Sequence, residues 1–280
     1  MKKFLKAVLE AAGWFALFMG IQFLVTLAGI LILMGNQVYH QGTALFENIE
    51  TFHGILMGLL MKHMTLLVLV SNLLTILIFW AFFSLRHRKM GNEIGLQRTT
   101  GRNLTLSVIF GTGMCFFMDL LTAVLPVPEQ VMEEFETQHG MLWFGDVGIT
   151  FLSVALLGPV SEEICFRGLC YGRLKKAMPP WAAGLISSVF FGLAHGDPVW
   201  FLVGFVAGLS LCWIYEITGS LLCAMIVHVT NNAISSMTAY FPVSDSFHRI
   251  LVLSSVVVTL VSGILLYRGR RFSDIQEEQL

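Results

Sequence analysis

Charged residues are scarce in this sequence. Only 12% of its 280 residues are charged, whereas 56% are hydrophobic and the mean hydropathy is +0.76. Soluble domains carry roughly 25% charged residues, so this chain has about half the usual supply. A polypeptide this apolar cannot cover itself with polar surface, which indicates the lipid bilayer as its solvent. The net charge of −1 argues against a nucleic-acid partner, which would favour a basic surface.

Cysteine pairs, a zinc-peptidase helix and a signal-peptide cleavage site are also missing. The five cysteines lie in or beside apolar segments and form no CxxC pair, so we interpret them as buried hydrophobes. No HExxH motif is present. The first apolar run continues to Met34 without a small-residue cleavage site, which favours a retained first helix.

Long apolar runs are what the sequence does have. A spanning helix needs about 20 mostly apolar residues. On this criterion we predict an all-α, polytopic transmembrane bundle of about eight helices, near 14–34, 65–85, 104–125, 147–176, 181–196, 199–215, 219–239 and 250–267. We divide the chain into N-terminal helices with an acidic outer loop (1–146), a helix core (147–240), and a last helix with its tail (241–280).

Basic residues mark one side of the predicted bundle. With the N-terminus inside, the inner segments hold fourteen Lys and Arg residues and the outer loops only Lys62 and Arg249. The positive-inside rule therefore predicts that both termini are cytoplasmic. The outer loop 126–146 is acidic and is expected to contain a short surface helix. Small residues at four-residue spacing (Gly184, Ser188, Gly192; Gly204, Gly208) predict close helix packing.

Six polar residues lie inside predicted spans, where an ionisable group is costly unless it is paired or faces a cavity. They are Glu162, Glu163, Arg167, His195, His228 and Asn232. Glu163 and Arg167 are one helical turn apart and can form an ion pair. Glu162 points about 100° away from Glu163. It is left for an apolar pocket, the environment expected of a general base.

Helix geometry also predicts depth. Two antiparallel helices joined near residue 179 rise equally, about 1.5 Å per residue, so Glu162 and His195 should lie at nearly the same height. The same reasoning places Asn232 roughly one turn and His228 roughly two turns from that level. We therefore predict a cluster of Glu162, His195, His228 and Asn232, provided that helix tilt closes the gap.

Structural roles are the alternative for these polar groups. A buried Glu163–Arg167 pair is more typical of structure than of catalysis. A lone membrane histidine such as His228 often only hydrogen-bonds a neighbouring helix. Asp119 has no evident partner and is expected to bond a neighbouring helix, and Asn231 is a possible substitute for Asn232. His139, His248 and the cluster Arg86-His87-Arg88 are expected to be solvated loop residues.

Three motifs give the cluster a resemblance. Residues 158–168, with Glu162, Glu163 and Arg167, resemble the EExxxR motif of the CAAX prenyl protease and bacteriocin-processing (Abi) family of intramembrane proteases. Residues 191–195 resemble its FxxxH motif, and residues 228–232 resemble its HxxxN motif. The motifs occur in order, in consecutive apolar segments, over about 90 residues. The rest of the chain is similar to the family only in hydrophobicity.

The resemblance implies an intramembrane endopeptidase of a bacterial plasma membrane. Glu162 would activate water with help from His195, and His228 with Asn232 would stabilise the oxyanion, a contribution often worth several kcal/mol. Glu163 and Arg167 would hold the geometry. We expect no obligatory metal, although Glu162, His195 and His228 could ligate zinc with an open fourth position. The substrate would be a peptide or protein, either prenylated or a bacteriocin or signal precursor.

Two other classes of function remain open at this stage. A non-enzymatic membrane scaffold or immunity protein would bind a peptide in the same cavity and would tolerate Glu162→Gln. A proton-coupled transporter would use Glu162 and His195 as a relay, but the sequence shows no evident internal repeat, a common feature of transporters.

Overall fold

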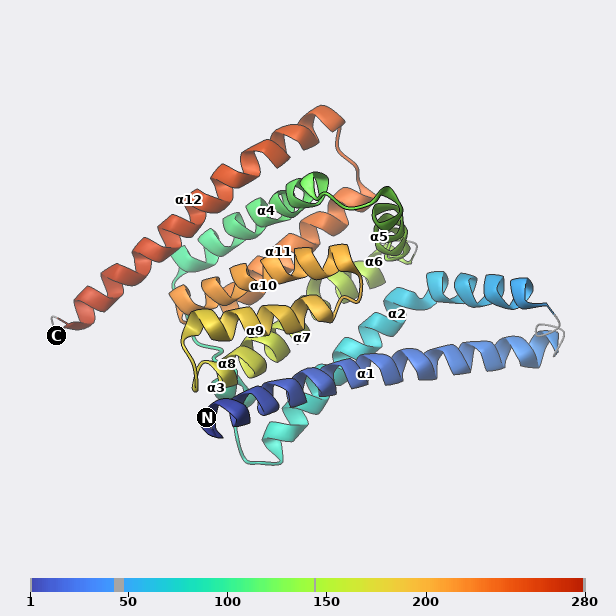
Figure 1. The fold of residues 1–280 in the computed structure, drawn as a ribbon, viewed down its shortest axis with the longest axis horizontal. Coiled ribbons are helices and arrows are strands. Elements are labelled where there is room, and N and C mark those ends of the chain that lie inside the picture. Colours follow the sequence, from blue (N-terminus) through green and yellow to red (C-terminus); the bar gives the residue numbers. More distant parts are fainter. Residues whose placement is uncertain (1, 43–47, 144, 279–280) are drawn as a thin grey trace.

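The protein is a polytopic bundle of helices (Figure 1). The computed structural model describes residues 2–42, 48–143 and 145–278, and every regular element in those ranges is helical. Seven helices there are long and apolar enough to cross a membrane, and an eighth apolar helix, α9 (Pro180–Leu193), has only 14 residues. The predicted all-α transmembrane bundle is confirmed. The segment predicted at 181–196 is a helix too short to span the hydrocarbon layer alone.

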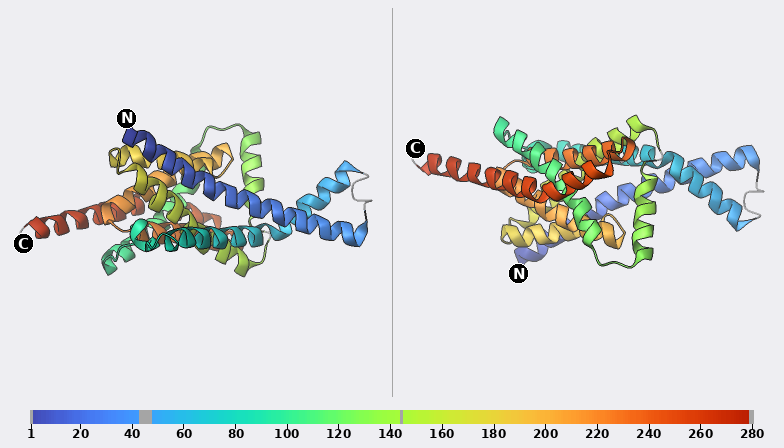
Figure 2. Two further views of the ribbon diagram at one scale, coloured as in Figure 1. Left: turned by 90° about the horizontal axis from the view of Figure 1, so that it is seen from below. Right: turned by 90° about the horizontal axis from the view of Figure 1, so that it is seen from above.

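The first two helices form a long hairpin that extends beyond the other helices at one end (Figures 1 and 2). They are α1 (Lys2–Gln41) and α2 (Ile49–Ser84), with 40 and 36 residues. Both are longer than the predicted 14–34 and 65–85. The search for about 20 apolar residues locates only the stretch that can cross the bilayer. Each helix continues beyond that stretch at one or both ends. At 1.5 Å per residue, α1 is about 60 Å long, twice the hydrocarbon thickness.

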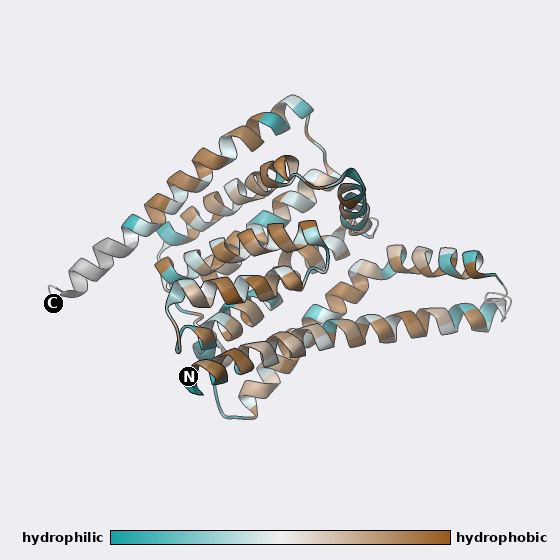
Figure 3. Ribbon diagram, in the orientation of Figure 1, coloured by the Kyte–Doolittle hydropathy of each residue, from teal (hydrophilic) through white to brown (hydrophobic). Residues whose placement is uncertain are grey.

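Three helices form a further layer of the bundle. In it α4 (Gly101–Val124) packs against both α11 (Leu221–Tyr240) and α12 (Asp245–Glu278). The predicted surface helix in the acidic loop is α5 (Glu129–Met141), whose residues are all partly or fully exposed, with His139 among the partly buried ones. Figure 3 shows hydrophobic residues along the spanning helices and hydrophilic residues on α5.

The centre of the bundle is an irregular helical segment. It runs through α6 (Val147–Thr150), the π-helix η2 (Phe151–Leu157), α7 (Gly158–Glu163), the π-helix η3 (Ile164–Tyr171) and α8 (Gly172–Leu174). All eight residues of η3 are buried. The remaining short helix, α3 (Met90–Glu93), lies between α2 and α4 in sequence. π-Helical turns are rare and are frequent at functional sites.

Small residues allow α9 and α10 (Pro198–Thr218) to pack closely. A Cβ atom added at Gly208 would lie 2.9 Å from the Cβ of Ser188, and one added at Gly192 would lie 2.6 Å from the carbonyl oxygen of Phe201. The predicted packing role of these positions is confirmed. It fixes the end of α9, where His195 follows.

Both termini lie at the same end of the bundle (Figures 1 and 2). This agrees with an even number of passes when the short α9 is counted. Which side of the membrane that end faces stays a prediction from the distribution of Lys and Arg.

Candidate active site

A buried ion pair anchors the site. The Nη1 atom of Arg167 donates to Oε1 of Glu163 over 2.8 Å, and both side chains are fully buried. The guanidinium also lies 4.2 Å from the ring centroid of Phe191. The predicted pairing of these residues is therefore confirmed, and it fixes the Glu163 carboxylate inside the bundle.

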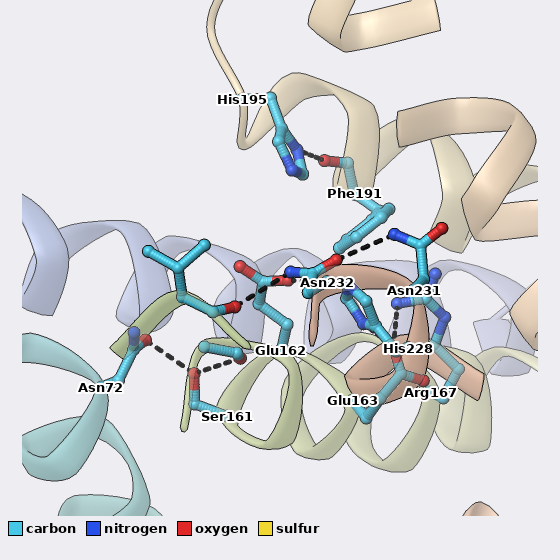
Figure 4. A network of polar contacts seen from close by, with 12 residues as sticks. Asn72, Ser161, Glu162, Glu163, Arg167, Phe191, His195, His228, Asn231 and Asn232 are labelled. Atoms are coloured by element: carbon cyan, nitrogen blue, oxygen red, sulfur yellow. Dashed lines mark hydrogen bonds and ion pairs between the residues drawn. The ribbon is translucent and has the colours of Figure 1, made fainter. Parts of the chain in front are cut away.

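His228 connects the two adjacent carboxylates (Figure 4). Its Nδ1 atom lies 2.8 Å from Oε1 of Glu163, and its Nε2 atom lies 3.6 Å from Oε2 of Glu162. Because the Glu163 carboxylate is a hydrogen-bond acceptor, it fixes the proton on Nδ1. Nε2 is then the nitrogen that faces Glu162, whose side chain is one quarter exposed. Glu163 thus orients the imidazole as well as holding Arg167.

Asn232 binds a carbonyl group that the local sequence leaves free. The amide of Gly158 donates to the carbonyl of Ser153, five residues back, as in a π-helix. The next donor in this pattern would be Pro159, which has no N–H, so the carbonyl of Val154 lacks its helical partner. Nδ2 of Asn232 donates to that oxygen over 3.0 Å. The Gly158-Pro159 sequence therefore leaves a free acceptor, and Asn232 fills it.

Asn231 supports Asn232 rather than replacing it. Its Nδ2 atom donates to Oδ1 of Asn232 over 2.9 Å. The sequence left open whether Asn231 could take the place of Asn232. In the structure the two side chains belong to one hydrogen-bonded unit (Figure 4).

His195 lies just past the end of α9, on the side of the site towards which the Glu162 carboxylate points (Figure 4). Its Nδ1 atom lies 2.8 Å from the carbonyl oxygen of Phe191, which accepts the hydrogen and leaves Nε2 as an acceptor. Its ring stacks on Trp200 with centroids 5.7 Å apart. Within the described ranges, no hydrogen bond or ion pair joins His195 to Glu162. The ring of His195 and that of His228 both contact the Phe191 ring, at centroid distances of 4.9 and 5.7 Å.

The predicted depths were wrong for His228. We expected His228 to lie farthest from the level of Glu162, yet it approaches Glu162 to 3.6 Å. The prediction assumed a constant rise per residue through three turns. The π-helix η3, which lies between Glu162 and the first of these turns, departs from that assumption, because its wider turns hold more residues than α-helical ones. Packing of α11 against both η2 and α7 then brings His228 to the carboxylates.

A polar contact beside Glu162 was not predicted. Oγ of Ser161 donates to Oδ1 of Asn72 on α2 over 2.7 Å, and Nε2 of Gln22 on α1 lies 3.3 Å from the same oxygen. This contact ties the residue before Glu162 to two other helices. The signal in the sequence was Asn72, a neutral polar residue inside an apolar span. A search for mainly ionisable groups misses it.

The suggested metal ligands are not gathered in one place. No three His, Cys, Asp or Glu side chains form a group that could hold a metal ion anywhere in the described part of the chain. Glu162 and His228 are close, whereas His195 is turned to the carbonyl of Phe191. The donor set does not fit a metal in this arrangement.

Three other polar residues lie elsewhere. Asp119 pairs with His248 on α12, at 3.6 Å, which is the predicted helix–helix role and lies outside the site. His248 is accordingly a residue of α12 and not of a loop. His139 was also expected to be a solvated loop residue, but it lies in α5 and its ring is 5.3 Å from that of Trp200. Burial lowers the pKa of His139.

Comparison with known proteins supports the motif-based resemblance. Residues 145–234 match the family described as type II CAAX prenyl endopeptidase Rce1-like. The chain is 27% identical over 120 residues to "Putative membrane peptidase YdiL" of Bacillus subtilis, covering 43% of this chain and 48% of that protein. It is 31% identical over 96 residues to "Membrane-embedded CAAX protease MroQ" of Staphylococcus aureus, covering 31% and 37%.

A further relative is similar over a longer stretch. "UPF0177 protein YxdF" of Lactococcus lactis is 26% identical over 167 residues, which cover 57% of this chain and 92% of that protein. By contrast, the chain spans about half the length of YdiL and less of MroQ. No solved structure matches the chain. The segment from residue 145 to residue 234, which holds all three motifs, is thus the part of the chain that is similar to the Rce1-like CAAX prenyl endopeptidase family.

Proposed function

We propose that this protein is an intramembrane endopeptidase that hydrolyses peptide bonds with water activated by Glu162. In this proposal residues 147–240 form the catalytic core. The observation that carries it is the position of His228, held by Glu163 at 2.8 Å with Nε2 3.6 Å from Glu162. A carboxylate and an oriented imidazole next to each other, at membrane depth, are a costly arrangement without a function.

The first step is attack of water on the substrate carbonyl. The Glu162 carboxylate takes one proton from the water, while Nε2 of His195 accepts a hydrogen bond from its other hydrogen. The water oxygen bonds to the carbonyl carbon, and the π electrons of the C=O bond move to its oxygen. A general base so placed typically contributes about 10²–10⁴-fold.

The negative oxygen of the intermediate then needs hydrogen-bond donors. Asn232 can donate with the Nδ2 hydrogen that Val154 does not use, and His228 can donate from Nε2 when its ring is protonated. Donors already in place at such an oxygen are worth several kcal/mol. The intermediate collapses when the C–N bond breaks and the leaving amine takes the proton from Glu162.

The family similarity and the membrane setting support a proposal for the substrate class. We propose a membrane-associated peptide or protein, either prenylated near its C-terminus or a bacteriocin or peptide-signal precursor. We also propose a bacterial plasma membrane with both termini cytoplasmic. The basic residues near both chain ends support that orientation.

The test compares wild type with Glu162→Gln and with Glu136→Gln, which removes the same charge from exposed α5. Membrane peptides from cells that express each form are compared by mass spectrometry. We expect peptides with new C-termini with wild type and Glu136→Gln, and none above background with Glu162→Gln. Equal processing by all three would refute the proposal. A substrate that binds Glu162→Gln and wild type alike, without cleavage by either, would favour the scaffold or immunity role.

A further inference from the structure

A cavity outside the active site lies near the N-terminus, between α1, the end of α2 and α8. Its volume is about 500 Å³. Figure 1 places these elements at the end of the bundle that holds both termini. Its walls combine one carboxylate and three aromatic rings with three arginines: Glu10, Trp14, Phe82, Phe83, Arg86, Arg88 and Arg173. We call it the arginine cavity.

The arginines of this cavity differ in their partners. Arg88 and Arg173 share one carboxylate, that of Glu93, at 3.4 and 3.3 Å. Arg86 makes no ion pair with any described residue, and its guanidinium lies 3.6 Å from the ring centroid of Phe82. One carboxylate thus holds two arginines in place, while the third presents free donors to the cavity.

The remaining acidic group does not neutralise the cavity. Glu10 lies 3.9 Å from Lys6, a basic residue of the same helix. Glu10 in the wall and Glu93 behind the arginines therefore each already face at least one cation other than Arg86. An excess of guanidinium groups in a recess suits a phosphate, because the planar group can donate two parallel hydrogen bonds to it.

The aromatic wall and its surroundings indicate where the phosphate comes from. Trp14, Phe82 and Phe83 give the cavity an apolar wall in addition to its arginines. The same two helices expose large apolar side chains outward, with Leu9 62% and Trp80 57% exposed. Such surfaces face lipid tails in a membrane protein. A polar recess on helices that also carry a lipid-facing surface suits a headgroup whose chains remain in the bilayer.

We propose that the arginine cavity binds the phosphate of an anionic phospholipid, with Arg86 as the main donor and the aromatic wall against the glycerol and upper acyl chain. Basic pockets between transmembrane helices are known to take anionic headgroups, and the negative surface potential of a leaflet attracts them further. This binding is independent of the peptidase activity proposed above.

The experiment measures lipid binding by the full chain in detergent, using native mass spectrometry. Phosphatidylglycerol, phosphatidylcholine and inorganic phosphate are titrated into wild type, Arg86→Gln and Arg98→Gln. Arg98 is the matched control, since it is exposed and does not line the cavity. We expect phosphatidylglycerol to bind wild type about tenfold more tightly than phosphatidylcholine, and Arg86→Gln to lose that factor. Arg98→Gln should bind as wild type does.

Two results would overturn the proposal. One is equal binding of the two lipids by wild type, a comparison that needs no variant to fold. The other is unchanged selectivity for phosphatidylglycerol in Arg86→Gln. Inorganic phosphate that binds in an Arg86-dependent way, without preference between the lipids, would instead identify a site for a soluble phosphate and would contradict the lipid assignment.

Discussion

Substitutions of Glu163 and Arg167 should distinguish two effects. The contact of Glu163 with Arg167 should affect stability, and its contact with His228 should affect catalysis. Both partners lie 2.8 Å from the same oxygen, Oε1, and the Glu163 and Arg167 side chains are fully buried. In Glu163→Leu the Arg167 guanidinium is left as an uncompensated buried charge. Its Nε and Nη2 atoms already have no hydrogen-bond partner within the described residues. Breaking a buried pair in this way costs about 3–5 kcal/mol, so a marked fall in thermal stability in detergent is expected.

The double variant Glu163→Leu with Arg167→Met removes both charges. Replacing a buried ion pair by apolar residues of similar volume is often neutral, so most of the lost stability should return. His228 nevertheless still lacks the acceptor that fixes Nδ1. If a misplaced His228 counts as one missing oxyanion donor, kcat should remain about 10²-fold below wild type.

The assay for this pair of variants combines thermal unfolding in detergent with initial rates on the peptide substrate identified by mass spectrometry. The reasoning would be refuted if the double variant regained wild-type kcat together with its stability. Glu163 would then act only as the counter-charge of Arg167, and the contact with His228 would have no catalytic role.

Four further outcomes follow from the geometry. Asn232→Ala should lower kcat by about 10²–10³-fold with little change in KM, as measured by initial rates, because it removes one donor to the intermediate. Gly208→Leu should unfold at a clearly lower temperature than wild type, because even its Cβ meets Ser188 at 2.9 Å. Burial lowers the pKa of His139, so the folded form binds fewer protons than the unfolded form. The stability that α5 gains from its contact with Trp200 should therefore fall as pH drops below the unfolded pKa of about 6.5, and hydrogen exchange of residues 129–141 should rise, except in His139→Phe. Finally, a zinc chelator should leave the cleavage rate unchanged, and a reversible loss restored by zinc would show that His195 moves to complete a metal site.

The sequence predicted the class of fold because hydrophobicity over about 20 residues is a local property. It also predicted the Glu163–Arg167 pair, since one helical turn relates the two residues directly. It did not predict that His228 would contact Glu163, which is 65 residues away. That contact depends on the packing of α11 against η2 and α7 and on π-helical turns whose positions no residue pattern specifies.

Asn232 shows a case that lay within reach of the sequence. Pro159 removes a backbone donor, so a carbonyl in the preceding turn must find another partner. A polar side chain from another helix was to be expected there. Which side chain supplies it, however, is settled only by the packing of α11 against η2.

The shortness of α9 bears on how water reaches a site of hydrolysis inside a membrane. Its 14 residues span about 21 Å, some 9 Å less than the hydrocarbon layer. The chain beyond it, with His195 and the turn at Gly196, is non-helical, and such backbone is tolerated at this depth only when protein covers it or water lines it. Trp200 and α5 supply part of that cover. A thinned bilayer or a water-filled funnel at the C-terminal end of α9 would let water reach Nε2 of His195. No channel through the whole protein would then be needed.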